Sequence, residues 1–198
     1  VLNAKNGETI WKKNRNTRNG WATPAVVEHE GKVQVITTAS RPEAGNRKTP
    51  GKVISYDLEN GNIVWECSGL TDNAIPCPIV EDGVAYCMTG YQGFSVLAVP
   101  ISGKGEQSKN ILWRRELGTP YVPSPILYDG LLYFSQSNQA ILSCVDAKTG
   151  KVLMERTRLP GLSNVYASLV GAGNHIYVVG RYGKTAVLKR TGKFDLVT

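Results

Sequence analysis

The sequence lacks any apolar run near the ~18 residues that a membrane-spanning helix needs, and it has no charged start followed by an apolar signal segment. It also lacks the apolar periodicity of helices, and no stretch of about ten or more residues is predicted to be helical. The first absence leaves the location of the protein open. The second predicts an all-β chain.

Residues that commonly carry metal or acid–base chemistry are few. The two histidines, His29 and His175, each lie beside a hairpin glycine and far apart in the sequence. Such positions are typical of polar turn residues. We therefore assign neither histidine a metal or catalytic role.

The four cysteines form neither a CxxC pair nor a metal-ligand spacing, which argues against a zinc site. Cys77 and Cys87 flank the turn EDG. A three-residue loop would let these two face one another, whereas a two-residue loop would put them on opposite faces of the hairpin, and the sequence does not decide the register. We expect buried free thiols at Cys67, Cys77, Cys87 and Cys144.

Positive charge is in excess but not obviously concentrated. Lysine and arginine number 23 against 16 aspartate and glutamate, a formal net charge of +7. The densest basic stretches, residues 11–21 and 41–52, coincide with clusters of turn residues and are interpreted as solvated loops. No nucleic-acid partner is expected, and an anionic glycan is kept as an alternative partner for these loops.

Glycines mark a repeat along the chain. Gly7, Gly61, Gly103, Gly150 and Gly192 recur at intervals of roughly 40 to 55 residues, a period typical of propellers and solenoids. Each period divides into four short apolar segments separated by hairpin turns such as Asp-Gly, where glycine supplies positive φ. The predicted units are an outer strand of a preceding blade at 1–13, blades at 22–67, 76–116 and 122–156, and an incomplete blade at 165–198.

A polar-glycine-apolar device ends each repeat. In YDLENGNIVW, Asp57 is expected to accept hydrogen bonds from turn amides, Gly61 to take a left-handed conformation, and Trp65 to cover the seam with a neighbouring blade. The third copy keeps its glycine and tryptophan but stretches the loop to PISGKGEQSKN and loses the aspartate. The residues assigned to this structural device are Trp11, Trp65, Trp113, Asp57, Gly61, Asp146 and Gly150.

The skeletons VDAKTGKVLM, YDLENGNIVW and LNAKNGETIW resemble the tryptophan-docking repeat of pyrroloquinoline-quinone-type β-propellers, over nearly the whole chain. The resemblance implies an all-β propeller of four-stranded blades, of which about four are present. Because such rings usually close with seven or eight blades, and half a ring would expose two apolar flanks, we expect the chain to be a fragment of a polypeptide about twice this long, with an N-terminal portion missing.

The family includes periplasmic alcohol dehydrogenases that bind the quinone with calcium, an outer-membrane assembly lipoprotein, and many exported proteins without assigned function. The dehydrogenases also use an aspartate base and an adjacent cysteine pair, and no Cys-Cys dipeptide occurs here. Asp57 and Asp146 belong to structural turns, so no catalytic, cofactor-binding or metal residue is assigned. A quinone- and calcium-dependent dehydrogenase with its site in the missing part stays as an alternative.

The resemblance therefore favours an exported binding or scaffold module, whether periplasmic, cell-surface or extracellular, with a protein or an extracellular polymer as partner. In a propeller, the connections between blades share a face with the loops between second and third strands. The loops of this predicted binding face are rich in arginine, tyrosine and amide side chains, which suit recognition. The candidate partner-binding residues are Arg18, Arg41, Arg47, Lys48, Tyr91, Tyr121, Asn138, Arg181 and Tyr182.

Overall fold

The computed structural model describes residues 1–42 and 49–198, and in these ranges the chain forms sixteen strands and no helix. The first sheet comprises β1 (Ala25–His29), β2 (Lys32–Ala39), β3 (Gly51–Asp57) and β4 (Ile63–Leu70), and the second comprises β5 (Ile79–Glu81), β6 (Val84–Thr89), β7 (Ser95–Pro100) and β9 (Trp113–Arg115). Within the described part of the chain there is no helix long and apolar enough to span a membrane.

The third and fourth sheets continue the same up-and-down order. The third comprises β10 (Ile126–Tyr128), β11 (Leu131–Ser135), β12 (Ile141–Asp146) and β13 (Val152–Arg158), and the fourth comprises β14 (Val170–Ala172), β15 (His175–Val179) and β16 (Thr185–Lys189). Residues 195–198 run antiparallel beside β16, with Val197 N–H donating to the Val187 carbonyl oxygen (2.7 Å). This places them where the other sheets carry their fourth strand.

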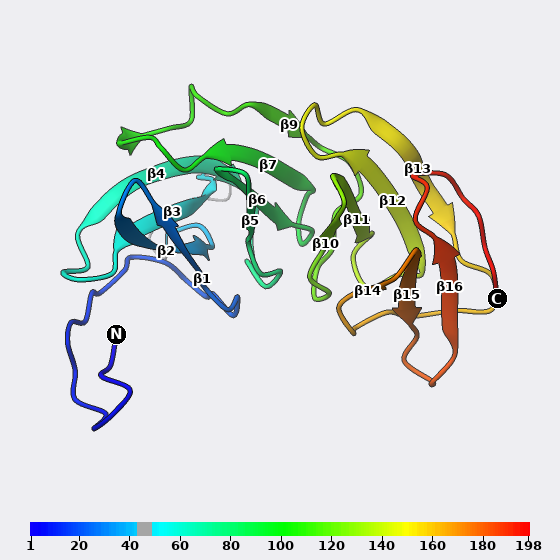
Figure 1. Cartoon of the computed structure of the whole chain (residues 1–198), viewed down its shortest axis with the longest axis horizontal. Helices are drawn as coiled ribbons and strands as arrows, with labels where there is room; N and C mark the ends of the chain where they lie inside the picture. Colours follow the sequence, from blue (N-terminus) through cyan, green and yellow to red (C-terminus); the bar gives the residue numbers. More distant parts are fainter. Residues whose placement is uncertain (43–48) are drawn as a thin grey trace.

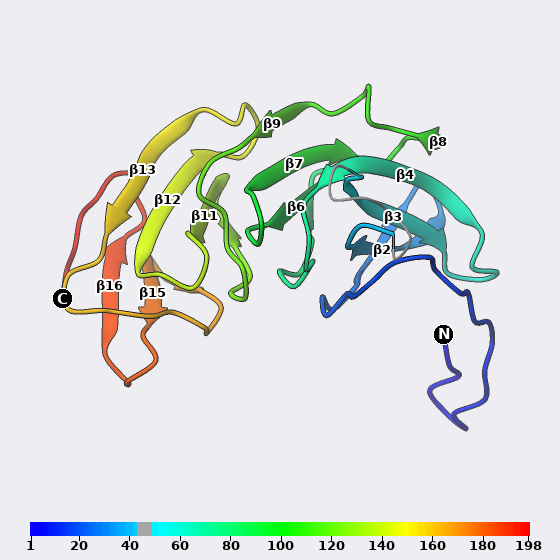
Figure 2. The ribbon, with the colours of Figure 1, turned by 180° about the vertical axis from the view of Figure 1, so that it is seen from behind.

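The four sheets stand side by side in an arc (Figure 1). The first strands β1, β5, β10 and β14 lie on the concave side of the arc, and the outer strands β4, β9 and β13 lie on its convex side. The two chain ends lie toward opposite ends of the arc, as the reverse view also shows (Figure 2). The predicted all-β, partial-propeller fold is thus confirmed.

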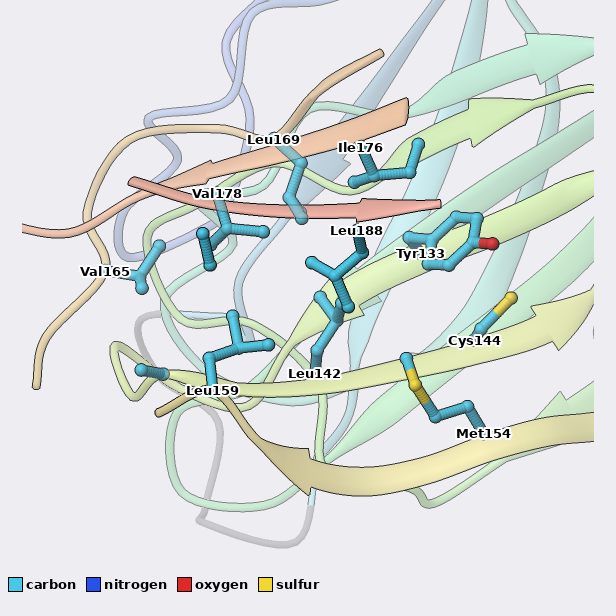
Figure 3. Close-up of a cluster of buried hydrophobic side chains, with 12 residues drawn as sticks. Tyr133, Leu142, Cys144, Met154, Leu159, Val165, Leu169, Ile176, Val178 and Leu188 are labelled. Carbon is cyan, nitrogen blue, oxygen red and sulfur yellow. The ribbon is translucent and has the colours of Figure 1, made fainter. Parts of the chain in front are cut away.

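Apolar packing occurs between neighbouring sheets, because alternating side chains of each strand point to one neighbour and then the other. Between the third and fourth sheets, Tyr133 and Leu142 face Ile176 and Leu188, and all four are fully buried (Figure 3). Comparable clusters join the first sheet to the second and the second to the third. Each blade is therefore stabilised by the blades beside it.

The hairpin turns explain the cysteine geometry. Asp82 and Gly83 both have positive φ (48° and 75°), as a two-residue hairpin turn requires, and the register pairs Ile79 with Tyr86. This register is the two-residue alternative, so it does not bring Cys77 opposite Cys87. All four cysteines are free thiols, three of them buried and Cys77 half-buried.

One predicted element is wrong. Residues 8–13, expected as an outer strand, join none of the four sheets, and the described segment 1–13 makes only an isolated bridge between Leu2 and Thr9. A strand needs a neighbour that takes its backbone hydrogen bonds, and none of the four sheets pairs with this segment. A second departure lies in the long loop of the second blade, where β8 (Gly105–Glu106) pairs in parallel with β4 and extends the first sheet.

Candidate functional site: a bonded loop face and its blade junctions

Tryptophan docking fixes the spacing between blades and hence the loops that they carry. The Trp113 indole Nε1–H donates to the Ala147 carbonyl oxygen in the turn of the next blade (2.7 Å). The ring lies against Gly150, whose φ is 67° and whose added Cβ would come within 2.5 Å of the indole. Glycine is therefore required here for two reasons, its left-handed backbone and the close approach of the ring.

The same contact occurs at the start of the chain. Trp11 Nε1–H donates to the Leu58 carbonyl oxygen (2.7 Å), and a Cβ on Gly61 (φ 69°) would lie 2.6 Å from the Trp11 ring. In both turns the aspartate acts as expected from the sequence. Asp57 Oδ1 accepts from the Glu59 amide (2.8 Å).

Asp146 Oδ1 accepts from the Thr149 amide (2.8 Å) and hydroxyl (2.6 Å). These two hydrogen bonds to Thr149 lower the pKa of the Asp146 carboxyl below its usual value. The carboxylate therefore stabilises its own turn.

Trp65 uses a different acceptor, because the turn of the second blade has no aspartate and a longer loop. The indole is fully buried and its Nε1–H donates to Gln34 Oε1 (2.9 Å), while Gln34 Nε2–H donates to the Ile101 carbonyl oxygen (3.1 Å). Ile101 is the residue that corresponds to Leu58 and Ala147 in the other blades. A side-chain amide thus relays the docking bond across the first junction, to the turn of the adjacent blade.

The loops predicted to share a face are joined there by backbone hydrogen bonds. The amide of Arg18 donates to the Arg41 carbonyl oxygen (3.1 Å), that of Tyr121 to Ser137 (3.1 Å), and that of Arg181 to Asn164 (2.8 Å). Each bond joins a connection between blades to a loop that follows a second strand. The face is consequently a connected surface of backbone rather than a set of independent loops.

Two of the candidate tyrosines are in direct contact. Tyr91, in the loop between β6 and β7, stacks on Tyr121 of the next connection, with ring centroids 4.9 Å apart. Asn73 Nδ2–H donates to the Tyr121 hydroxyl oxygen (3.4 Å). Tyr91 remains 37% exposed, so the stack presents an ordered aromatic edge to solvent at the junction of the second and third blades.

A second group lies on the fourth blade. The Arg181 guanidinium lies over the ring of Tyr166, 5.5 Å from its centroid, and both line a shallow pocket. Neighbouring Tyr182 is 77% exposed. The described contacts do not join this group to the Tyr91–Tyr121 stack, so the structure divides the predicted cluster into two.

The remaining candidates are placed less favourably for contact with a partner. Arg18 is exposed, and no contact with the two tyrosine groups is described for its side chain. The side chain of Asn138 is already engaged, because its Oδ1 accepts a hydrogen bond from the Val122 amide (3.1 Å). Arg41 is buried rather than solvated, and its Nε lies 2.9 Å from Asp72 Oδ2. Arg47 and Lys48 lie outside the described residues.

Several neighbours of these residues were missed in the sequence. Asp72 and Arg114 line a pocket with Arg41, Trp21 is exposed on the same face, and Tyr166 supports Arg181. The tyrosine in SNVYAS could have been found by comparison with the one in GTPYVP, because both occupy connections between blades. Across residues 1–42 and 49–198, histidine, cysteine, aspartate and glutamate side chains form no group of three or more that could hold a metal ion.

Comparisons with known proteins agree with this geometry. The family model described as "Outer membrane protein assembly factor BamB" matches residues 1–193. The chain belongs to this family. The crystal structure of BamB from Moraxella catarrhalis superposes with a TM-score of 0.64 at 19% identity, covering 100% of this chain and 53% of that one. This chain therefore spans about half the length of that BamB chain.

Two computationally designed proteins share the fold. Ika8 matches with a TM-score of 0.55 at 12% identity, over 85% of this chain and 46% of its own. Ika4 matches with a TM-score of 0.55 at 11% identity, over 90% of this chain and 99% of its own. No curated protein matches this member of the BamB family in sequence. Such low identities establish a shared architecture and carry no residue roles across.

Proposed function

We propose that this chain is a non-catalytic binding or scaffold module that engages a protein partner through its loop face. The observation that carries the proposal is the Tyr91–Tyr121 stack, which is half-exposed and held by its neighbour Asn73. Aromatic side chains fixed before binding lose little conformational freedom on contact, so they are effective anchors of interfaces. Family membership supports the same class of function, because the matching family is described as an assembly factor of outer-membrane proteins.

We further propose that the chain is exported and works as part of a longer propeller whose other blades cover its two flanks. The family description and the coverage of about half of a BamB chain support this. A bound quinone or calcium is not part of the proposal, because Asp57 and Asp146 are engaged by turn amides. Apart from the long loop of the second blade, the opposite face carries short turns and offers little adaptable surface.

Site-specific photo-crosslinking tests the proposed face. A photoreactive amino acid at position 91 or 182 should form adducts with the partner in cells that produce the protein, and the same probe at Lys148, an exposed turn residue of the third blade, should form none. Alanine at Tyr91, Tyr121, Arg181 and Tyr182 together should abolish the adducts. We expect the lost tyrosine stack to lower the free energy of unfolding by about 0.5 to 1.5 kcal/mol, in addition to the cost of the apolar area that the two rings no longer bury.

Two results would decide against this function. A footprint confined to the outer strands or to the Lys148 face would show that the wrong surface was chosen. A complex that weakens steeply with ionic strength and survives the tyrosine substitutions would point instead to an anionic glycan on the basic loops, since screening acts on charge and hardly affects apolar contact.

A further inference from the structure

A polar pocket of about 360 Å³ lies at the junction of the first and second blades. Its walls come from the residue Arg41 after β2, the residues just before β3, the end of β4 and the connection that follows it, the loop between β6 and β7, and the outer strand β9. Pockets of this size accommodate a small ligand. The polar side chains that line it and carry the inference are Arg41, Ser68, Thr71, Asp72, Gln92 and Arg114.

A buried ion pair forms one wall. Arg41 Nε lies 2.9 Å from Asp72 Oδ2, and each side chain is only 10% exposed. A guanidinium has five N–H donors, more than a single carboxylate can accept from. Asp72 therefore fixes the orientation of Arg41 without satisfying its capacity to bind an anion.

The same pair is incompletely hydrogen-bonded. Arg41 Nε is buried and lies close to Asp72 Oδ2 without forming a hydrogen bond to it, and buried Asp72 Oδ1 likewise has no hydrogen-bond partner among the described residues. Buried polar atoms without partners are rare in proteins, and they are found where a ligand or an ordered water completes the network. This pair marks the pocket as a place where a group with both acceptors and donors is favoured.

Arg114 brings a second positive charge to the lining of the pocket. Its side chain is 47% exposed and pairs at 3.1 Å with Glu116, which is itself largely exposed. The Arg114 guanidinium lies beside the backbone of Gly69, where an added Cβ would be 3.7 Å from Arg114 Nη1, an ordinary van der Waals distance.

We propose that this pocket binds a sugar acid, a ligand that carries one carboxylate next to several hydroxyl groups. The two guanidinium groups match the carboxylate, since charge-assisted hydrogen bonds to arginine are among the strongest that proteins make. Hydroxyl groups match the acceptor surface of Asp72 and the polar side chains Ser68, Thr71 and Gln92. An aspartate or glutamate of a protein partner would bring a carboxylate but no donor for Asp72, and it would fill little of the volume.

Nuclear magnetic resonance titration of the isotopically labelled chain tests the site directly. D-glucuronate should shift the amide resonances of Gly69, Thr71 and Gln92, and it should bind at least about tenfold more tightly than D-glucose, which lacks the carboxylate, or acetate, which lacks the hydroxyls. Arg114→Gln should weaken D-glucuronate binding by about tenfold or more. Arg158→Gln, at an exposed arginine on β13, should leave it unchanged.

The choice of Arg114 keeps folding separate from binding, because its side chain is half-exposed, whereas Arg41→Gln would leave Asp72 buried without its partner. An oligomer of glucuronate that binds more tightly than the monosaccharide assigns the site to a polymer, and equal affinity assigns it to a free sugar acid. The proposal is overturned if glucuronate shifts none of these amides, if glucose or acetate binds equally well, or if Arg114→Gln has no effect. This test does not use the tyrosine variants of the loop face. The proposed sugar-acid site can therefore be wrong while the proposed protein-binding face is right, and the reverse.

Discussion

Gly150 and Gly130 both hold positive φ in the third blade, at 67° and 72°, yet only Gly150 lies beneath a tryptophan. A Cβ on Gly130 would meet no heavy atom within 4 Å, whereas a Cβ on Gly150 would lie 2.5 Å from the Trp113 ring. Alanine at the two positions therefore imposes the same backbone strain but different packing. The pair separates the conformational role of the turn glycine from its role in docking.

The expected costs follow from these contacts. Gly130→Ala should lower the free energy of unfolding by about 1 to 2 kcal/mol, the cost of a left-handed conformation for a residue with a Cβ. Gly150→Ala adds overpacking of about 1 to 3 kcal/mol. Displacement of the ring also breaks the bond from Trp113 to Ala147, with a net cost of about 1 kcal/mol. We expect a total of about 3 kcal/mol or more.

Urea unfolding followed by far-ultraviolet circular dichroism measures both variants without using tryptophan as the reporter. In a Trp113→Ala background the ring is gone, so Gly150→Ala should fall back to the cost of Gly130→Ala. The coupling between positions 113 and 150 should then be about 2 to 4 kcal/mol, the sum of the overpacking and hydrogen-bond costs. Equal costs for Gly150→Ala and Gly130→Ala, or a cost of Gly150→Ala that does not change when Trp113 is removed, would refute the docking explanation.

Two further predictions concern buried side chains. Trp65→Ala should lower the free energy of unfolding by about 3 to 5 kcal/mol, and a loss below about 1 kcal/mol in denaturant melts would contradict its packing between blades. At about pH 8 a thiol reagent should modify half-buried Cys77 first and the three buried cysteines only on unfolding, because burial raises the pKa of Cys67 to about 11 and of Cys144 to about 12. These folded pKa values exceed the ordinary value of 9.0. The contribution of the two buried thiols to the free energy of unfolding should therefore be fully present below about pH 9 and decline toward pH 11. Cys67→Ser should reduce that decline, and rapid modification of all four thiols in the native state would contradict the burial.

The repeat geometry was largely predictable because it depends on local chemistry. Asp57 and Gly61 act within five residues of each other, so hydrogen bonding and backbone preference determine their turn whatever the rest of the chain does. The Asp82–Gly83 hairpin is equally local. By contrast, no local pattern could show that residues 8–13 would lack a partner strand, since a strand depends on a neighbour elsewhere in the chain.

The candidate site was less predictable, because its features depend on pairs far apart in sequence. Tyr91 and Tyr121 could be assigned to one face from propeller topology, but their stacking depends on how two blades meet. Arg41 lies in a basic, turn-rich stretch that predicts a solvated loop. Only the position of Asp72 beside it explains its burial. Charge in a sequence does not show which charges are already neutralised.

The Gln34 relay limits how freely the repeats of this chain could be exchanged. The Gln34 amide accepts from Trp65 and from the Ser55 hydroxyl (2.7 Å) in its own blade and donates to Ile101 in the next. A second blade with an ordinary aspartate turn, introduced by duplication or recombination, would have to fit this amide as well as the tryptophan. Blades one and two are therefore expected to diverge as a unit, so that a chimaera joined between them would lose more stability than one joined at the Trp113 junction, where the indole bonds directly to backbone.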